Sequence, residues 1–168
     1  MSCRNCRNPL ILILAMVWLH SSRAEPVARP ADSWEEYDLL AKVVVQSVDS
    51  HEEHVYRRSP DSQLAGHPLH VELVETLRKT DDVDMSKLLV TAWTIHGGRR
   101  YGNPDLEAGR VAPSNVVSIA CRIYLSEATW CVVEWVLTDD MWETYQRQKG
   151  TGVVERPYSP EDYDIQQR

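Results

Sequence analysis

The sequence is short of basic residues. Among 168 residues, 18 are lysine or arginine and 25 are aspartate or glutamate, so the formal net charge is −7. Nucleic-acid binding needs a surplus of Lys and Arg to neutralise phosphates, and the charge balance therefore argues against such a partner. Glycine (7) and proline (9) occur at near-average levels, which excludes collagen-like and broadly disordered chains. The length suits one domain with its own core.

No apolar run is long enough to span a bilayer. The longest, residues 10–19, has ten residues, about half of what a membrane-spanning helix needs. Arg4 and Arg7 precede this run, and Ser22-Arg23-Ala24 follows it with small residues at the two positions that a signal peptidase reads. The pattern predicts a signal peptide over residues 1–24. We therefore expect a secreted, extracellular protein without membrane attachment once the leader is removed.

Cysteine is scarce in the predicted mature chain. The leader contains Cys3 and Cys6, and its removal leaves only Cys121 and Cys131. An even number of cysteines in an oxidising compartment predicts one disulfide between these two residues. The leader also contains three of the 18 basic residues and none of the acidic ones, so the predicted mature chain has a net charge of −10.

The first part of the mature chain has the pattern of a helix. Residues 25–32 form an arm without periodicity, and Ser33 with Glu36 then fits a capping box. Behind it, apolar residues recur at steps of three and four, which predicts an amphipathic helix over residues 33–58. The β-branched run at 43–45 disfavours a helix slightly, but the period outweighs it. The apolar set is Trp34, Tyr37, Leu40, Ala41, Val44, Val48 and Val55.

Period-two alternation follows the predicted helix. Residues 71–77 and 87–95 read as two strands that pair as a hairpin, after a turn-rich connection at 59–68. Residues 97–114 contain four glycines and two prolines and are predicted to form a long exposed loop. From residue 146 the chain loses apolar content, and the tail is expected to be mobile.

The last predicted hairpin joins residues 117–125 to residues 131–137. In both strands the apolar residues occupy odd positions, so pairing Cys121 with Cys131 puts both apolar sets on one side of the sheet. The disulfide and the hydrophobic pattern therefore predict the same register. Together these elements predict an α+β domain over residues 33–145, with one long N-terminal helix packed on a four- to five-stranded antiparallel sheet.

Residue patterns that carry chemistry are missing. His51 and His54, and likewise His67 and His70, are three apart, but they lack the order of zinc-protease ligands. Paired aspartates stand in predicted turns, where aspartate is expected for backbone reasons. The sequence contains neither a nucleophile elbow nor a phosphate-binding glycine loop. We therefore expect no enzyme, no bound metal and no cofactor.

The segment Cys121-Arg122-Ile123-Tyr124, followed by Trp130 and an apolar strand, resembles the final hairpin of the cystatin family. The resemblance implies a cystatin-like fold and inhibition of papain-like cysteine proteases. It also implies that two hairpin tips, Asp81-Asp82-Val83 and Trp130, face the protease. The sequence departs from the family because the arm has no glycine and the first tip is acidic. A diverged relative that binds proteins without inhibiting a protease is therefore also implied.

Other interpretations remain open. A lipocalin-like carrier of a small ligand would require that the helix is misassigned and further strands are missed. An acidic module that binds another protein fits the net charge, and its binding would be sensitive to salt. Trp130 is either an interface anchor or a residue packed with Tyr124 on the outer face of the sheet. Tyr158 and Tyr163 stand in an acidic stretch, where sulfation is a further hypothesis.

Overall fold

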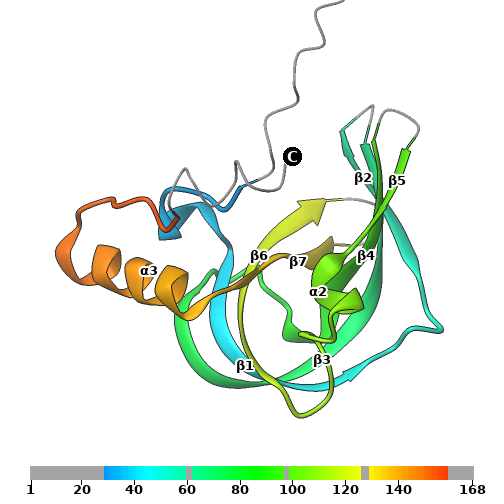
Figure 1. The fold of residues 1–168 in the computed structure, drawn as a ribbon, viewed down its shortest axis with the longest axis horizontal. Helices are drawn as coiled ribbons and strands as arrows, with labels where there is room; N and C mark the ends of the chain where they lie inside the picture. Colours follow the sequence, from blue (N-terminus) through cyan, green and yellow to red (C-terminus); the bar gives the residue numbers. More distant parts are fainter. Residues whose placement is uncertain (1–28, 60–61, 97–98, 126–128, 159–168) are drawn as a thin grey trace, which may run out of the picture.

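The protein is built around a seven-stranded mixed sheet. The computed structural model describes residues 29–59, 62–96, 99–125 and 129–158, so the predicted leader and Tyr163 lie outside the described residues (Figure 1). The strands are β1 (Leu39–Val48), β2 (His54–Ser59), β3 (Ser62–Lys79), β4 (Leu88–His96), β5 (Arg99–Gly102), β6 (Val116–Leu125) and β7 (Thr129–Leu137). The helices are short: η1 (Trp34–Glu36), η2 (Met85–Lys87), α2 (Pro104–Glu107) and α3 (Asp139–Thr151). The predicted fold class, a long N-terminal helix on a smaller antiparallel sheet, is therefore wrong.

The predicted helix over residues 33–58 is replaced by η1, β1 and β2. The capping box is present, since the Ser33 side chain accepts from the Glu35 backbone N–H and the Glu36 side chain reaches back to the Ser33 N–H, but it caps only one 3₁₀ turn. Both faces of β1 are buried: residues 39, 41, 43 and 45 face one apolar cluster and Leu40 faces another. A strand buried on both faces is apolar at most positions, so its sequence also satisfies a helical period. The β-branched run at 43–45, which favours a strand, was the better indicator of the local structure.

Five of the strands close into a barrel. The order is β3-β1-β6-β7-β4, and the pairing of β3 with β4 completes the ring. All pairings are antiparallel except that of β4 with β7. This order, with its single parallel pair, is that of the five-stranded Greek-key barrel known as the OB-fold. β2 extends the sheet along β3, and β5 extends it along β4.

The predicted hairpin of residues 71–77 with residues 87–95 is wrong, because residues 71–76 pair with β1 instead. β3 and β4 are antiparallel neighbours through residues 62–68 of β3, the segment that was predicted to be part of a connection. Gly66 and Pro68 give this segment the composition of a turn. Gly66 instead allows close packing, because a Cβ there would lie 3.1 Å from the Leu89 Cβ and from the Val90 carbonyl oxygen.

The final hairpin, β6 with β7, is antiparallel as predicted, but its register differs by two residues. Cys121 pairs with Val133, and Cys131 pairs with Ile123, with an irregularity between Ala120 and Cys121. A shift of two keeps the parity of the side chains, so both cysteines still point into the barrel. Cys121 and Cys131 are free thiols in the structure, and the predicted disulfide between them is not present.

The barrel interior is a packed apolar core. Its thirteen buried residues come from all five barrel strands and from the connections around Val83 and Val111. In small barrels the interior is wide enough only for side chains. The interior is thus filled, which differs from the internal ligand cavity that a lipocalin-like carrier requires.

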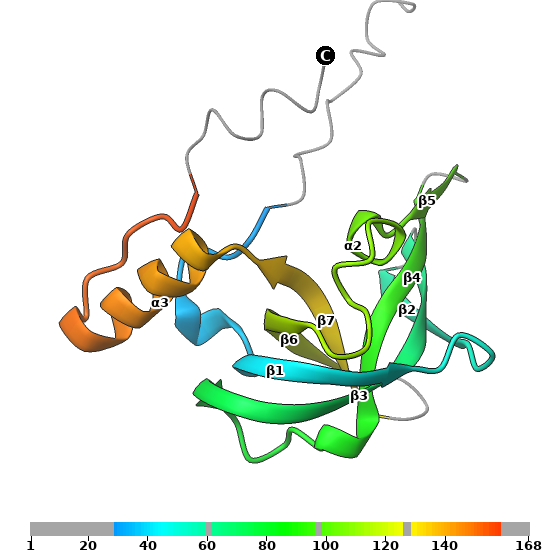
Figure 2. The same cartoon turned by 60° about the horizontal axis from the view of Figure 1, so that its bottom comes forward.

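A second layer covers the outer face of β1 and β6. Helix α3 packs there beside η1, as Figure 2 shows. Trp142 and Tyr145 of α3 are buried against Tyr37, Leu40 and Ala120. The predicted start of a mobile tail, residue 146, lies inside α3, and Gln148 is 2% exposed.

Candidate functional site: a polar cleft outside the barrel

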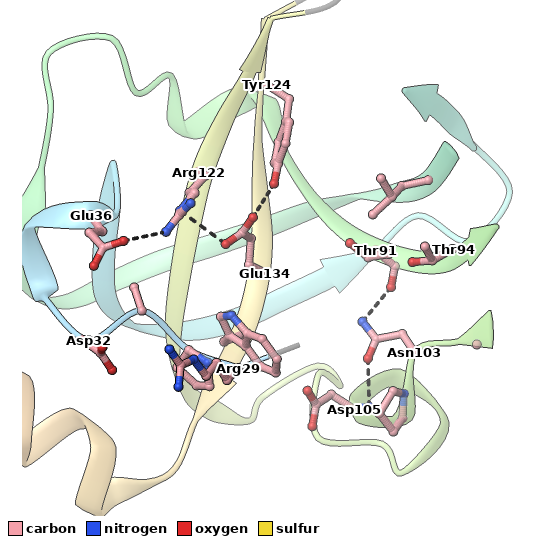
Figure 3. Close-up of a pocket in the computed structure, with 16 residues that line it drawn as sticks. Arg29, Asp32, Glu36, Thr91, Thr94, Asn103, Asp105, Arg122, Tyr124 and Glu134 are labelled. Atoms are coloured by element: carbon pink, nitrogen blue, oxygen red, sulfur yellow. Dashed lines mark hydrogen bonds and ion pairs between the residues drawn. The ribbon is translucent and has the colours of Figure 1, made fainter. Parts of the chain in front are cut away.

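A cleft of about 510 Å³ lies on the outer surface of the barrel. It opens where β4 and β7 diverge after their short parallel pairing at residues 88–90 and 131–133. One wall consists of β6, β7 and η1, and the other of β4, β5 and the start of α2 (Figure 3). Concave sites with a few convergent polar groups are the usual places for ligand binding.

The wall on β6 and β7 carries a chain of charged groups. The Arg122 guanidinium lies between two carboxylates, 3.5 Å from Glu36 and 3.4 Å from Glu134. The Tyr124 hydroxyl donates a hydrogen bond to Glu134. The Glu134 side chain is only 10% exposed, and a charge in such a position is costly unless it is paired. Hence the wall presents a fixed, internally paired array of charges.

The opposite wall is positioned by the Asn103 side chain. Asn103 Nδ2 donates to the Thr91 carbonyl oxygen at 2.7 Å, and Asn103 Oδ1 accepts from the Asp105 N–H at 2.9 Å (Figure 3). Asn103 is the N-cap of α2 and ties that helix to the edge of β4. Asp105 then faces the cleft, with the Arg110 guanidinium at 3.2 Å.

An apolar cluster lies beneath the two walls. Tyr56, Leu64, Leu89 and Val132 are buried together, and Tyr124 and Trp130 pack against them. The rings of Tyr56 and Tyr124 are 5.6 Å apart. Leu64 and Tyr124 reach the cleft itself. A ligand in the cleft would therefore meet an apolar floor and charged sides.

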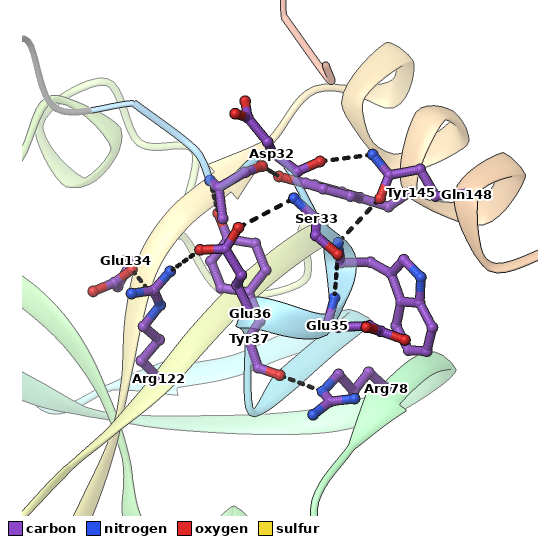
Figure 4. A network of polar contacts seen from close by, with 12 residues as sticks. Asp32, Ser33, Glu35, Glu36, Tyr37, Arg78, Arg122, Glu134, Tyr145 and Gln148 are labelled. Carbon is purple, nitrogen blue, oxygen red and sulfur yellow. Dashed lines mark hydrogen bonds and ion pairs between the residues drawn. The ribbon is translucent and has the colours of Figure 1, made fainter. Parts of the chain in front are cut away.

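The N-terminal arm forms the rim of the cleft at residues 29–32. Gln148 of α3 holds the arm, because its Nε2 donates to the Asp32 carbonyl oxygen and its Oε1 accepts from the Trp34 N–H (Figure 4). Tyr145 donates to the Ala31 carbonyl oxygen, and Tyr158 donates to the Asp32 carboxylate at 2.9 Å. The rim is thus fixed by residues more than a hundred positions away in the sequence.

Burial changes the acidity of several groups around the cleft. Burial raises the pKa of Asp105 above its usual range, although the neighbouring Arg110 charge acts in the opposite direction. Beside the rim, burial raises the pKa of Tyr37 to about 12. Burial, with Tyr37 as a neighbour, also raises the pKa of Tyr145. Asp105 is therefore a carboxylate whose negative charge the fold compensates only in part.

The three residues of the first predicted tip, Asp81, Asp82 and Val83, differ in their exposure. Asp82 lines a separate hollow of about 500 Å³ together with Asp38 and Thr129. Val83 is 4% exposed and belongs to the barrel core, so it is not available to a partner. Asp81 is exposed.

Trp130 packs on the outer face of the sheet. Its ring lies 4.3 Å from the His54 ring, and it shares the apolar cluster with Tyr124, which it faces across the strands. This is the second of the two settings expected for Trp130. Tyr158 is buried at 8% exposure and holds Asp32.

The cleft residues were not identified by sequence reasoning. Arg122, Tyr124 and Glu134 are the even-numbered residues of the final hairpin, and only the odd-numbered apolar set was used to predict the fold. Charged residues at alternate positions of a strand indicate its solvent face, which was the available signal. Asn103 and Asp105 stand in a segment predicted to be loop, where nothing in the sequence indicated their position.

Across residues 29–158, apart from the three undescribed gaps, no group of three or more His, Cys, Asp or Glu is placed to hold a metal ion. His54 instead contacts Glu52, at 2.7 Å, and His67 contacts the Glu52 carbonyl oxygen. No helix of the described part combines the length and the apolarity that a membrane crossing requires.

Comparison with known proteins adds no relative. The chain matches no family model, no curated protein and no solved structure.

Proposed function

We propose that the chain is a secreted binding protein whose cleft receives a basic segment of a partner protein. The observation that carries the proposal is the cleft itself, with an apolar floor and an excess of carboxylates on its walls and rim. Asp32, Glu36, Asp105 and Glu134 line it, against Arg29 and Arg122. Secretion rests on the predicted leader, which lies outside the described residues.

The charge of the whole chain supports the same partner. The formal net charge of −7 becomes −10 when the leader, with three arginines and no acidic residue, is removed. A negative surface accelerates the encounter with a positive partner, and a cleft with low-dielectric walls focuses the field. Asp105, whose charge burial disfavours, would gain most from an approaching cation.

Binding is better supported than catalysis. The carboxylates of the cleft are held by arginine and tyrosine partners and show no paired acid and base at a common point. A general acid or base must reach the proton that it transfers. We therefore propose that the cleft positions a partner and performs no chemical step.

Two of the other expected functions depended on structural features that differ from those of the described residues. Protease inhibition relied on a cystatin-like fold and on a first tip that includes Val83, which is buried in the barrel core. A lipocalin-like carrier relied on an internal cavity, and the interior is packed with side chains. The acidic binding module depends on neither feature, and the proposal develops that expectation.

Peptide binding tests the proposal directly. Residues 25–168 would be titrated against synthetic peptides that are matched in length and apolar content but differ in net charge. Basic peptides should bind more tightly than acidic ones, and added salt should weaken the binding because screening reduces it. Glu134→Gln and Asp105→Asn should each weaken binding about three- to tenfold, as expected for the loss of one favourable charge contact.

The control is Glu143→Gln on α3, which removes the same charge from an exposed position outside the cleft. It should leave affinity unchanged within about twofold, since a remote exposed charge contributes little. Equal binding of basic and acidic peptides would overturn the proposal. An effect of Glu143→Gln as large as that of Glu134→Gln would show that net charge, and not the cleft, attracts the partner.

A further inference from the structure

Beyond the barrel, the sheet continues as an extension of four strands, β2-β3-β4-β5. The extension consists of residues 54–59, 62–66, 93–96 and 99–102, which pair in that order. The barrel pairings lie elsewhere, because β1 pairs with β3 from residue 69 onwards and β7 pairs with β4 only at residues 88–90. In Figure 1 the ends of β2, β4 and β5 stand out from the barrel. The extension therefore has two faces, and one of them forms part of the cleft wall.

The face of the extension opposite to the cleft carries apolar and basic side chains. Leu64 and Thr94 pair with each other and line the cleft, so their neighbours along each strand point to the other side. We call that side the arginine–tryptophan face, and its residues are Val55, Arg57, Gln63, Trp93, Ile95 and Arg100. Two contacts agree with this placement. The Glu53 carboxylate accepts from Trp93 Nε1–H at 2.8 Å, and the Arg100 guanidinium lies 4.6 Å from the centre of the Trp93 ring.

The centre of the arginine–tryptophan face is apolar and accessible. Val55 is 51% exposed, and Trp93 and Ile95 are each partly exposed. In the part of the chain that the structure describes, none of the three belongs to a buried apolar cluster. Large apolar side chains that gather on a surface indicate an interaction site.

The two arginines of this face keep their charge uncompensated. Arg110 and Arg122 each contact carboxylates. By contrast, Arg57 and Arg100 are exposed, and among the described residues neither has a carboxylate partner. Stacking on Trp93 restrains the Arg100 guanidinium, so less side-chain entropy is lost when it binds an anion. In a chain whose predicted mature net charge is −10, this face is a local site for negative charge.

The strand register sets the distance between the two arginines. Arg57 pairs with Gln63, Gln63 pairs with Ile95, and Ile95 pairs with Arg100. Because neighbouring strands are about 4.8 Å apart, three steps separate the two arginine Cα atoms by about 14 Å. An extended chain advances about 3.3 Å per residue, so about four residues span this distance.

We propose that the arginine–tryptophan face binds an acidic, extended segment of a partner protein with the pattern acidic–x–apolar–x–acidic. Alternate side chains of an extended segment point to the same side. The two carboxylates therefore reach Arg57 and Arg100, where bidentate pairing is available, and the apolar side chain between them packs on Ile95 and Trp93. The inference goes beyond the proposed function, because it concerns the opposite face of the extension and a partner segment of opposite charge.

The surroundings favour a short acidic peptide over a long polyanion. The negative charge of the rest of the chain repels a polyanion that runs over the surface. Glu53, bonded to Trp93, adds a negative charge beside the face and restricts anion contacts to the row between the two arginines. The apolar centre matches an apolar side chain, which a sulfated saccharide does not have.

The experiment titrates residues 25–168 against fluorescently labelled peptides of about eight residues, with binding followed by fluorescence anisotropy. The probe peptide has aspartate at its third and seventh positions and leucine at its fifth. One control peptide has the same composition with adjacent aspartates, and a second has lysine in place of both. The probe should bind about threefold or more tightly than the first control and about tenfold or more tightly than the second.

Variants of single arginines locate the site on one face. Arg57→Gln and Arg100→Gln should each weaken binding of the probe about three- to tenfold, because each removes one charge-assisted contact. The matched control is Arg99→Gln, since Arg99 is exposed on the same strand but alternates to the other face. It should change the affinity by about twofold or less. Equal weakening by Arg99→Gln and Arg100→Gln would show attraction by net charge alone and would overturn the inference.

A charge exchange tests the pairing directly. Arg100→Glu should weaken binding of the probe about tenfold or more, because like charges then oppose each other. Replacing one aspartate of the probe by lysine, at each position in turn, should restore the affinity of this variant to within about threefold for one of the two peptides. No recovery with either peptide would contradict the proposed pairing.

Other occupants give distinct results. A heparin-derived oligosaccharide that binds through Arg57 and Arg100, while no acidic peptide binds, would overturn the choice of a peptide. Self-association in sedimentation equilibrium that Arg57→Gln abolishes, again without peptide binding, would assign the face to a second copy of the chain and overturn the inference. Glu134→Gln should leave binding of the acidic probe unchanged, so this inference and the proposed function fail independently.

Discussion

The inner and outer faces of the β6–β7 hairpin have opposite surroundings. On the inner face, Ile119, Cys121 and Val133 are at most 3% exposed and belong to the apolar cluster of the barrel core. On the outer face of the same two strands, Arg122 and Glu134 form an ion-pair array beside the cleft. The two sets alternate along β6 and along β7 up to Glu134, so neighbouring residues of the chain have different roles.

The difference between these faces separates stability from binding. Burial of apolar area on the inner face contributes to folding roughly in proportion to the area removed from water. The outer charges are paired and partly solvated, and such pairs contribute little net stability. Residues on the inner face should therefore control the free energy of unfolding, and those on the outer face should control what the cleft binds.

The largest expected effect tests the inner face. Ile119→Ala should lower the free energy of unfolding by about 2–5 kcal/mol, because it removes buried methyl groups and leaves a cavity in a packed core. Urea denaturation followed by circular dichroism measures the change. The control is Val116→Ala at the start of the same strand, where the side chain is 63% exposed, and it should cost less than about 0.5 kcal/mol. Similar losses for both variants would contradict a packed interior.

A second prediction concerns the cluster that joins the arm to α3. Burial raises the pKa of Tyr37 from 10.0 to about 12, and the pKa of Tyr145 rises as well. The unfolded chain releases these protons first, so stability is fully present below about pH 10 and is lost as pH rises toward 12. For Tyr37 alone the loss is about 2–3 kcal/mol.

Denaturant unfolding at a series of alkaline pH values measures that loss. Tyr37→Phe should flatten the decline, because the variant cannot ionise at this position. Tyr101→Phe is the matched control, since Tyr101 is 50% exposed. A decline in stability that persists unchanged in Tyr37→Phe would assign the alkaline sensitivity to other groups.

The two faces also explain how much of the fold the sequence could predict. The β6–β7 hairpin was recognised because one face is buried and the other solvated, so period two is visible. β1 was misassigned because Leu40 is buried on one face while Leu39 and Ala41 are buried on the other, so that alternation disappears. Barrel closure depends on the pairing of β3 with β4 through residues 62–68. The glycine and proline of this segment give it the composition of a turn, so the sequence did not predict a strand there.

The cleft could be predicted only in part. The charged residues at even positions of the β6–β7 hairpin indicate its outer face, but the residues that they contact come from distant parts of the chain. Glu36 reaches Arg122 across 86 positions, and Gln148 holds Asp32 across 116. Such contacts depend on the register of the barrel and on the placement of α3, which no local pattern encodes.

The smallest expected change in stability concerns Asp105, which lies on the opposite wall of the cleft and tests whether a cleft carboxylate serves binding rather than stability. Burial raises the pKa of Asp105, so the folded state holds this proton more tightly than the unfolded chain does. The contribution of Asp105 to stability therefore falls as pH rises through the region just above 3.8. The contribution of a salt-bridged aspartate, whose pKa is lowered, would instead rise with pH.

Asp105→Asn removes that dependence and should be neutral or stabilising by no more than about 0.5 kcal/mol at neutral pH. Its advantage over the parent protein should shrink as pH is lowered, because Asp105 then becomes neutral in both states. Urea midpoints at acid and neutral pH measure this. The same variant should weaken binding of a basic peptide, so stability and affinity would move in opposite directions, as they do where a fold keeps a costly charge for binding. A marked loss of stability in Asp105→Asn would instead make Asp105 a structural residue, held for its ion pair with Arg110.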